Sequence, residues 1–151
     1  MSEHELQRSI DFGLENAERI HLRIATILQT TTSEEIKTSA LAYECLGYYN
    51  AIEHLIVRIF KHLQIDIPTG PFSHRDTLAR FESLLDEKGV AASGGVVNAI
   101  ENLMAFRHVA TKIYGFLIDL GKLQVIVDEI RQHHAVICQL FKDVTRHLKD
   151  S

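Results

Sequence analysis

The chain has 151 residues and a mass of 17.1 kDa, which is the usual size of one compact domain. Hydrophobic residues make up 46% and charged residues 24% of it, and this balance excludes the disordered, collagen-like and low-complexity classes. The net charge of −4 and the pI of about 6.1 exclude a global basic field that would attract nucleic acid or an anionic membrane. We therefore predict a single domain over residues 1–151, in which any contact with nucleic acid comes from a local cluster.

The N-terminal segment and the cysteines predict a cytoplasmic protein. Residues 1–8 carry two glutamates and no apolar run, unlike a signal peptide, and no stretch approaches 18 uninterrupted apolar residues. Cys45 and Cys138 fall inside apolar helical patterns rather than at the spacings of a disulfide framework. We expect a reducing compartment, no membrane contact, and both thiols in the core.

Apolar residues recur at steps of three and four along most of the chain, whereas strand signals are nearly absent. The pattern predicts five helices: from about Ser2 to Gln29, from a cap at Thr31–Ser33 to a point before Pro68, from His74 to Lys88, from Val96 to Leu117, and from the residue after Gly121 to the end of a seam at Leu148. The apolar seams of the second and last helices are Leu41, Cys45, Tyr48, Ile52, Leu55, Ile59 and Leu63, and Leu123, Val127, Ile130, His134, Ile137, Phe141, Val144 and Leu148. Ser73 is expected to cap the short third helix, and Gly89 to close it. The predicted fold is an all-α bundle of four long helices and one short helix.

Familiar catalytic and metal motifs are missing from the sequence. It has no glycine-rich phosphate loop, no Cys-x-x-Cys, no nucleophile elbow and no paired Glu-x-x-His. Among nine histidines, the best metal-ligand pair is His134 with Cys138, four positions apart on one helix. Two ligands do not make a site, and His134 lies on an apolar seam, so a hydrogen-bonded core or interface histidine is favoured. We predict no metal and no cofactor.

The fourth predicted helix carries an unusual set of polar residues. At 100° per residue, Arg107 and Tyr114 share one flank, two turns and about 10 Å apart, while Lys112 projects away from the apolar stripe. His108 lies about 40° from Lys112 and is therefore near the same face. The alternative is an ordinary helix with a snorkelling arginine, a solvated lysine and a boundary tyrosine.

This segment resembles the HepT-like proteins of the HEPN superfamily, the toxin half of HEPN/MNT toxin–antitoxin pairs. Members carry Phe-Arg-His, a short spacer and a His-x-Tyr-Gly-Phe-x-x-Asp run; here stand Phe106, Arg107, His108, Tyr114, Gly115, Phe116 and Asp119. Upstream, members carry Ser-Trp-His-Arg-Asp, and the similar segment here is Phe72, Ser73, His74, Arg75 and Asp76, without the tryptophan. The order of helices is also similar, so the resemblance spans nearly the whole chain and implies a HEPN-like helical bundle.

The resemblance implies a homodimer that acts as a metal-independent endoribonuclease, with the Arg-x4-His motifs of both protomers meeting at the dimer cleft. It also implies a small nucleotidyltransferase antitoxin that silences the toxin by attaching AMP to the motif tyrosine. Arg107 takes the place of the motif arginine and Tyr114 that of the AMP acceptor. The catalytic histidine does not carry over, because Lys112 stands five positions after Arg107.

The change to lysine matters chemically, because cleavage needs a base for the 2′-OH proton and an acid for the leaving 5′-oxygen. A lysine with a reference pKa of about 10.4 is charged and cannot accept a proton unless its surroundings depress that pKa strongly. Lys112 can still stabilise charge or act as an acid, and His108 is a candidate substitute. His74, Arg75 and Asp76 open the third helix, either as a capping segment or as a second contribution to an RNA or antitoxin surface.

Three classes of function follow. The first is a ribonuclease toxin in which Lys112 or His108 replaces the usual histidine, and the retained Arg107 and Tyr114 favour it. The second is a degenerate homologue that keeps the dimer and the nucleotidyltransferase partner but no longer cuts RNA. The third is a plain helical interaction or nucleotide-binding module, for which the acidic charge is typical. No DNA partner is expected.

Overall fold

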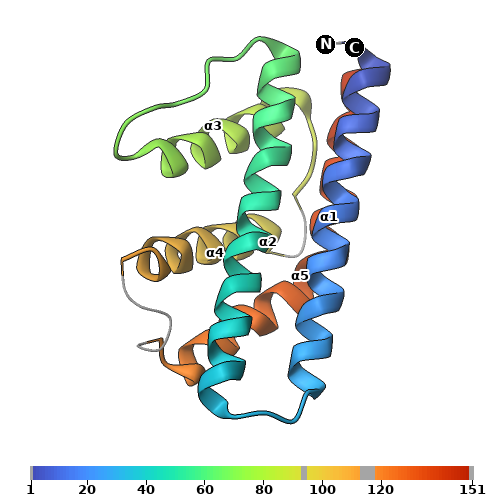
Figure 1. Cartoon of the computed structure of the whole chain (residues 1–151). Helices are drawn as coiled ribbons and strands as arrows, with labels where there is room; N and C mark the ends of the chain where they lie inside the picture. Colours follow the sequence, from blue (N-terminus) through green and yellow to red (C-terminus); the bar gives the residue numbers. More distant parts are fainter. Residues whose placement is uncertain (1, 93–94, 113–117, 150–151) are drawn as a thin grey trace.

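The computed structural model describes residues 2–92, 95–112 and 118–149. Every regular element within these ranges is a helix, which confirms the all-α prediction. The helices are α1 (Glu3–Gln29), α2 (Glu34–Leu63), α3 (Ser73–Lys88), α4 (Val96–Ala110) and α5 (Leu120–Lys149). In Figure 1, α1 and α2 form a long antiparallel pair joined by a short loop, and α5 lies behind α1. The helices α3 and α4 pack on α2 and α5, on the side away from α1.

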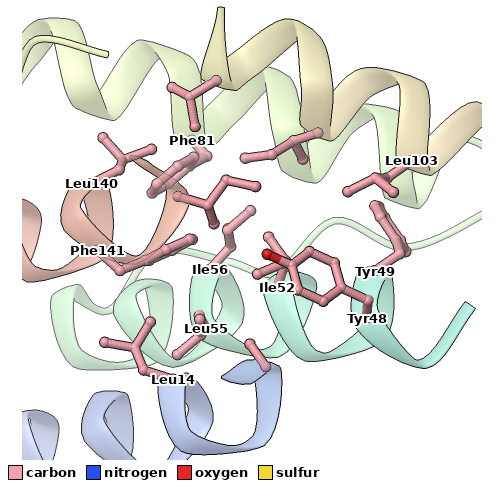
Figure 2. Packing of buried hydrophobic residues seen from close by; sticks show 14 of the residues in the cluster. Leu14, Tyr48, Tyr49, Ile52, Leu55, Ile56, Phe81, Leu103, Leu140 and Phe141 are labelled. Atoms are coloured by element: carbon pink, nitrogen blue, oxygen red, sulfur yellow. The ribbon is translucent and has the colours of Figure 1, made fainter. Parts of the chain in front are cut away.

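One apolar core joins all five helices. The seams predicted for α2 and α5 are buried except at Leu63; the buried members are Leu41, Cys45, Tyr48, Ile52, Leu55 and Ile59 on α2 and Leu123, Val127, Ile130, His134, Ile137, Phe141, Val144 and Leu148 on α5. The rings of Phe81 on α3 and Phe141 on α5 stack at 5.5 Å, and Figure 2 shows them with Ile56 of α2 and Leu140 of α5. Each such side chain contributes about 1.5–3 kcal/mol on burial, so the steps of three and four are what fix the bundle.

Polar groups begin and close the helices much as expected. Ser2 and Ser33 cap α1 and α2, where their hydroxyls accept from the main-chain N–H three residues on. Gly89 closes α3 in the left-handed conformation. The expectation for Ser73 is wrong: it is the first residue of α3, and Phe72 precedes it without a side-chain cap.

The boundary predicted for the fourth helix is also wrong, because α4 ends at Ala110 rather than at Leu117. The Thr111 hydroxyl donates to the carbonyl oxygens of Arg107 and His108, and the Lys112 N–H bonds Val109 three residues back. These bonds satisfy carbonyl groups in the last turn of the helix. The helical wheel therefore does not place Lys112, and residues 113–117, including Tyr114, lie outside the described residues.

The last helix begins at Leu120, so Gly121, which was predicted to precede it, lies in its first turn. Asp119 precedes it, and its carboxylate accepts a hydrogen bond from the Gly121 N–H at 3.1 Å. None of the described helices is both long and apolar enough to cross a bilayer.

Candidate functional site

A groove of about 510 Å³ lies between the start of α3 and the last turns of α4. Four side chains with ring or guanidinium nitrogens line it: His74, Arg75, Arg107 and His108. The two segments that were singled out separately in the sequence, more than 30 positions apart, therefore share one concave surface. This local cluster of basic groups is what an acidic chain needs in order to bind a phosphodiester.

The Arg107 side chain lines the groove and is half-buried. Its Nε is fully buried and has no hydrogen-bond partner among the described residues. Buried donors in native proteins are nearly always paired, so an unpaired guanidinium nitrogen beside a groove suits an anionic ligand. The charge of Arg107 also acts on Tyr49 of α2. The arrangement thus places a fixed cation next to open space.

The His74 ring is hydrogen-bonded to a carboxylate of α2. Its Nδ1 lies 2.6 Å from Oε2 of Glu53, and the Tyr49 hydroxyl donates to the same oxygen at 2.7 Å. Burial, and then the hydrogen bond to Glu53, raise the pKa of Tyr49, whereas Arg107 lowers it, so the hydroxyl stays protonated and donates. A carboxylate on Nδ1 fixes the ring and directs Nε2 away from Glu53.

Glu53 and Tyr49 were missed in the sequence. They lie four residues apart on α2, and their relation to His74 depends on how α3 crosses that helix. The available signal in the sequence was the position of Glu53, a charged residue directly after the apolar Ile52, which is buried in the structure.

Arg75 stacks on the aromatic ring of Phe72, and both side chains line the groove. Its guanidinium carbon lies 4.6 Å from the centroid of the exposed Phe72 ring. A stacked arginine and an exposed aromatic ring are the groups on which unpaired nucleobases stack.

Of the remaining predicted site residues that the structure describes, only one lines the groove. His108 is exposed and lines the groove next to Arg107. Lys112 and Asp76 are both exposed and are not among the side chains that line it, and Lys112 lies in the turn after α4. The structure thus brings His108, rather than Lys112, to Arg107.

His134 confirms the expectation of a hydrogen-bonded core histidine. It is 6% exposed, and its ring contacts Tyr48 of α2 and Glu18 of α1. Cys45 is buried as predicted, whereas Cys138 is only partly buried, at the edge of the core.

A comparison with protein families decides the family. The profile described as HepT-like protein matches residues 40–148, well over half of the chain. The chain is a HepT-like protein. The matched span includes every residue that lines the α3–α4 groove of this HepT-like protein. No curated protein and no solved structure matches the chain.

Proposed function

We propose that this HepT-like protein is the toxin of a HEPN/MNT pair and acts as a metal-independent endoribonuclease. The observation that carries the proposal is the convergence of Arg107, His108 and His74 on one groove. One guanidinium and two imidazoles are the groups that phosphodiester cleavage without a metal requires.

The proposed reaction is attack by a ribose 2′-oxygen on the adjacent phosphorus. One imidazole takes the 2′-OH proton while the P–O5′ bond breaks, and the other protonates the departing 5′-oxygen. The products are a 2′,3′-cyclic phosphate and a 5′-hydroxyl end, so protons and bonds balance. Arg107 binds the non-bridging oxygens and stabilises the charge that develops on them.

The two imidazoles have different surroundings, which suggests their roles. The Nδ1 atom of His74 is hydrogen-bonded to Glu53, so Nε2 is the nitrogen left for the substrate, and His74 is assigned as the acid. His108 is exposed at the groove and is assigned as the base. Lys112, which faces solvent outside the groove, contributes charge to binding of the RNA backbone and not proton transfer.

An apolar surface beside the groove supports the proposed homodimer. Val109 on α4 and Val125 on α5 are 53% and 59% exposed, and with the partly buried Phe106 they line a second groove, of about 470 Å³. Val109 lines both grooves, so association through this surface would bring the catalytic groups of two protomers together.

The nucleotidyltransferase partner and the AMP acceptor role of Tyr114 rest on the family. Co-expression with a nucleotidyltransferase of the antitoxin family is expected to add AMP to this tyrosine, as detected by mass spectrometry of the intact protein. The adduct should be absent from a Tyr114→Phe variant and should abolish RNA cleavage. An AMP adduct on another residue would overturn this part of the proposal.

A second candidate is a degenerate homologue that binds its nucleotidyltransferase partner without cutting RNA. The observation that favours it is Lys112, which stands at the position of the family's histidine and lies outside the groove. The two candidates differ in whether purified protein cleaves RNA.

The test of the proposed function is cleavage of a transfer-RNA pool by the purified protein in excess EDTA. Arg107→Ala is expected to lower the rate by at least about 100-fold, the cost typical of losing one preorganised donor to a developing oxyanion. Arg8→Ala, which removes an exposed arginine from α1, is the matched control and should cleave like the wild type. Equal rates for the two variants, or no cleavage by the wild type, would refute the ribonuclease assignment.

A further inference from the structure

Three potential metal ligands, Glu18 and His21 from α1 and His134 from α5, meet where the middle of α1 packs on α5, and Cys138 lies beside His134. These four residues are the α1–α5 cluster. The ligand atoms of Glu18, His21 and His134 all lie within 4.8 Å of one another. Cys138 Sγ lies 3.7 Å from Nε2 of His134. None of the four lines the α3–α4 groove.

The spacing within each helix puts the ligands on one face. Glu18 and His21 are three residues apart, and His134 and Cys138 are four apart, so each pair projects from the same side of its helix. Two such pairs on packed helices supply four donors from different turns. The sequence showed only the second pair, because the first lies more than 110 residues away.

His134 is already oriented as a ligand. Its Nδ1 lies 2.8 Å from the Tyr48 hydroxyl oxygen, and its Nε2 contacts the Glu18 carboxylate. Because the carboxylate can only accept, Nε2 carries the proton here and Nδ1 accepts from the Tyr48 hydroxyl. Binding of a metal through Nε2 moves that proton to Nδ1, which then donates to the Tyr48 oxygen. Such second-shell contacts to the far nitrogen are the rule for metal-binding histidines.

His21 has an unmet hydrogen-bonding need. Its Nδ1 is buried and has no partner among the described residues. Its ring stacks on His134 with centroids 4.3 Å apart and planes at 12°. Because the two rings are nearly parallel, the partly exposed His21 ring must rotate to face a shared ion.

We propose that the α1–α5 cluster binds one Zn²⁺ ion. Imidazole, thiolate and carboxylate together are a zinc ligand set. At bond lengths of about 2.0–2.3 Å, two ligands of one tetrahedral ion lie about 3.3–3.6 Å apart. Cys138 Sγ lies 3.7 Å from Nε2 and 3.8 Å from Nδ1 of His134, so it is within reach of the ion but must turn toward the Nε2 side. Glu18, whose side chain is half exposed, can move aside to admit the ion. A solvent-open cavity lined by Glu18, His134 and Cys138 gives the ion an entry path.

Four protein ligands leave no open position, so the zinc is structural. It joins α1 to α5 and stabilises the folded state, which alone holds the four ligands together. The inference does not depend on the proposed ribonuclease activity, and its test uses metal binding rather than RNA cleavage.

The test is titration of untagged, EDTA-stripped and dialysed full-length protein with Co²⁺ and then with Zn²⁺. Co²⁺ should bind with one-to-one stoichiometry and give visible bands of a tetrahedral site together with an ultraviolet thiolate charge-transfer band. Zn²⁺ should displace it and raise the midpoint of thermal unfolding. No saturable binding at one equivalent would overturn the proposal, and binding without the thiolate band would overturn the assignment of Cys138.

Variants separate this site from surface binding. Glu18→Gln, His21→Gln and Cys138→Ser should each weaken Zn²⁺ at least about 10-fold, the loss typical even of second-shell changes. Glu5→Gln removes the same charge from an exposed site on α1 away from the cavity, and His54→Gln removes an exposed histidine from α2. Both controls should bind like the wild type. Equal affinity for Glu18→Gln and Glu5→Gln would refute the site, and circular dichroism of each variant without metal checks that it is folded.

Discussion

Gly13 lies where α1 approaches α2 too closely for a side chain. A Cβ at this position would lie 2.4 Å from Cδ2 and 3.1 Å from Cγ of Leu55, which is fully buried. At Gly47 on α2, a Cβ would meet only Cδ1 of Ile20, at 3.7 Å. Both glycines are inside helices, so they form a matched pair that differs in the space around them.

The expected effects of alanine have opposite signs at the two positions. Replacing a helical glycine by alanine stabilises by about 1 kcal/mol when the site is open. Gly47→Ala should therefore raise the free energy of unfolding by that amount, or the melting temperature by about 2–4 °C for a chain of this size. At Gly13 the same gain is offset by overpacking against Leu55, which costs about 1–3 kcal/mol. Gly13→Ala should leave the free energy of unfolding unchanged or lower it by up to about 2 kcal/mol.

Urea unfolding followed by far-ultraviolet circular dichroism measures both free energies. The double variant with Leu55→Ala provides the internal check, because it removes the atoms that the new Cβ would meet. In that background, Gly13→Ala should stabilise the protein. Equal stabilisation by Gly13→Ala and Gly47→Ala in the wild-type background would refute the close approach of α1 to α2 at Leu55.

Two further predictions concern titratable side chains. Burial, and then a hydrogen bond with Glu101, raise the pKa of Glu82, so the protonated form is favoured in the folded state and stability from this group is lost as pH rises through the folded-state pKa. Glu82→Gln should therefore stabilise the folded protein at neutral pH by at most about 0.5 kcal/mol and so raise its melting temperature. This gain should shrink in acid, and a pH-independent difference would contradict the prediction. Burial raises the pKa of Cys45 to about 12, which leaves about one thiol in 10⁴ ionised near pH 8. In a Cys138→Ser background, Cys45 should react with an aromatic disulfide reagent only on unfolding, and rapid reaction of the native protein would show that the thiol is accessible.

The helices could be predicted because burial in this bundle follows a simple period. The stripe from Leu123 to Leu148 is buried at every predicted position, including His134. The end of α4 could not be predicted in this way, because Ile113 and Leu117 continue the apolar steps beyond the helix. At its end the main chain tightens, with the Lys112 N–H bonded to the Val109 carbonyl three residues back, and hydrophobic periodicity does not report such a turn.

The candidate groove was predictable only in parts. Arg107 and His74 stood out by their residue types and by the family resemblance, but the sequence did not show that α3 brings them to one surface. Glu53 was missed because its partner His74 lies 21 positions away on another helix. The same limit hid Glu18 and His21, which complete a ligand set with His134 across 116 positions. Contacts between distant helices depend on packing, which one-dimensional spacing does not contain.

The central claim is that His108, and not Lys112, supplies the proton transfer that the family assigns to its motif histidine. Rates of RNA cleavage by His108→Ala and Lys112→Ala, measured side by side on one defined RNA in excess EDTA, test it most directly. His108→Ala should lower the rate by about 10²–10⁴, the cost of losing a general acid or base, while Lys112→Ala should lower it less than about 10-fold. A large loss in Lys112→Ala with full activity in His108→Ala would contradict the account and return the catalytic role to the lysine.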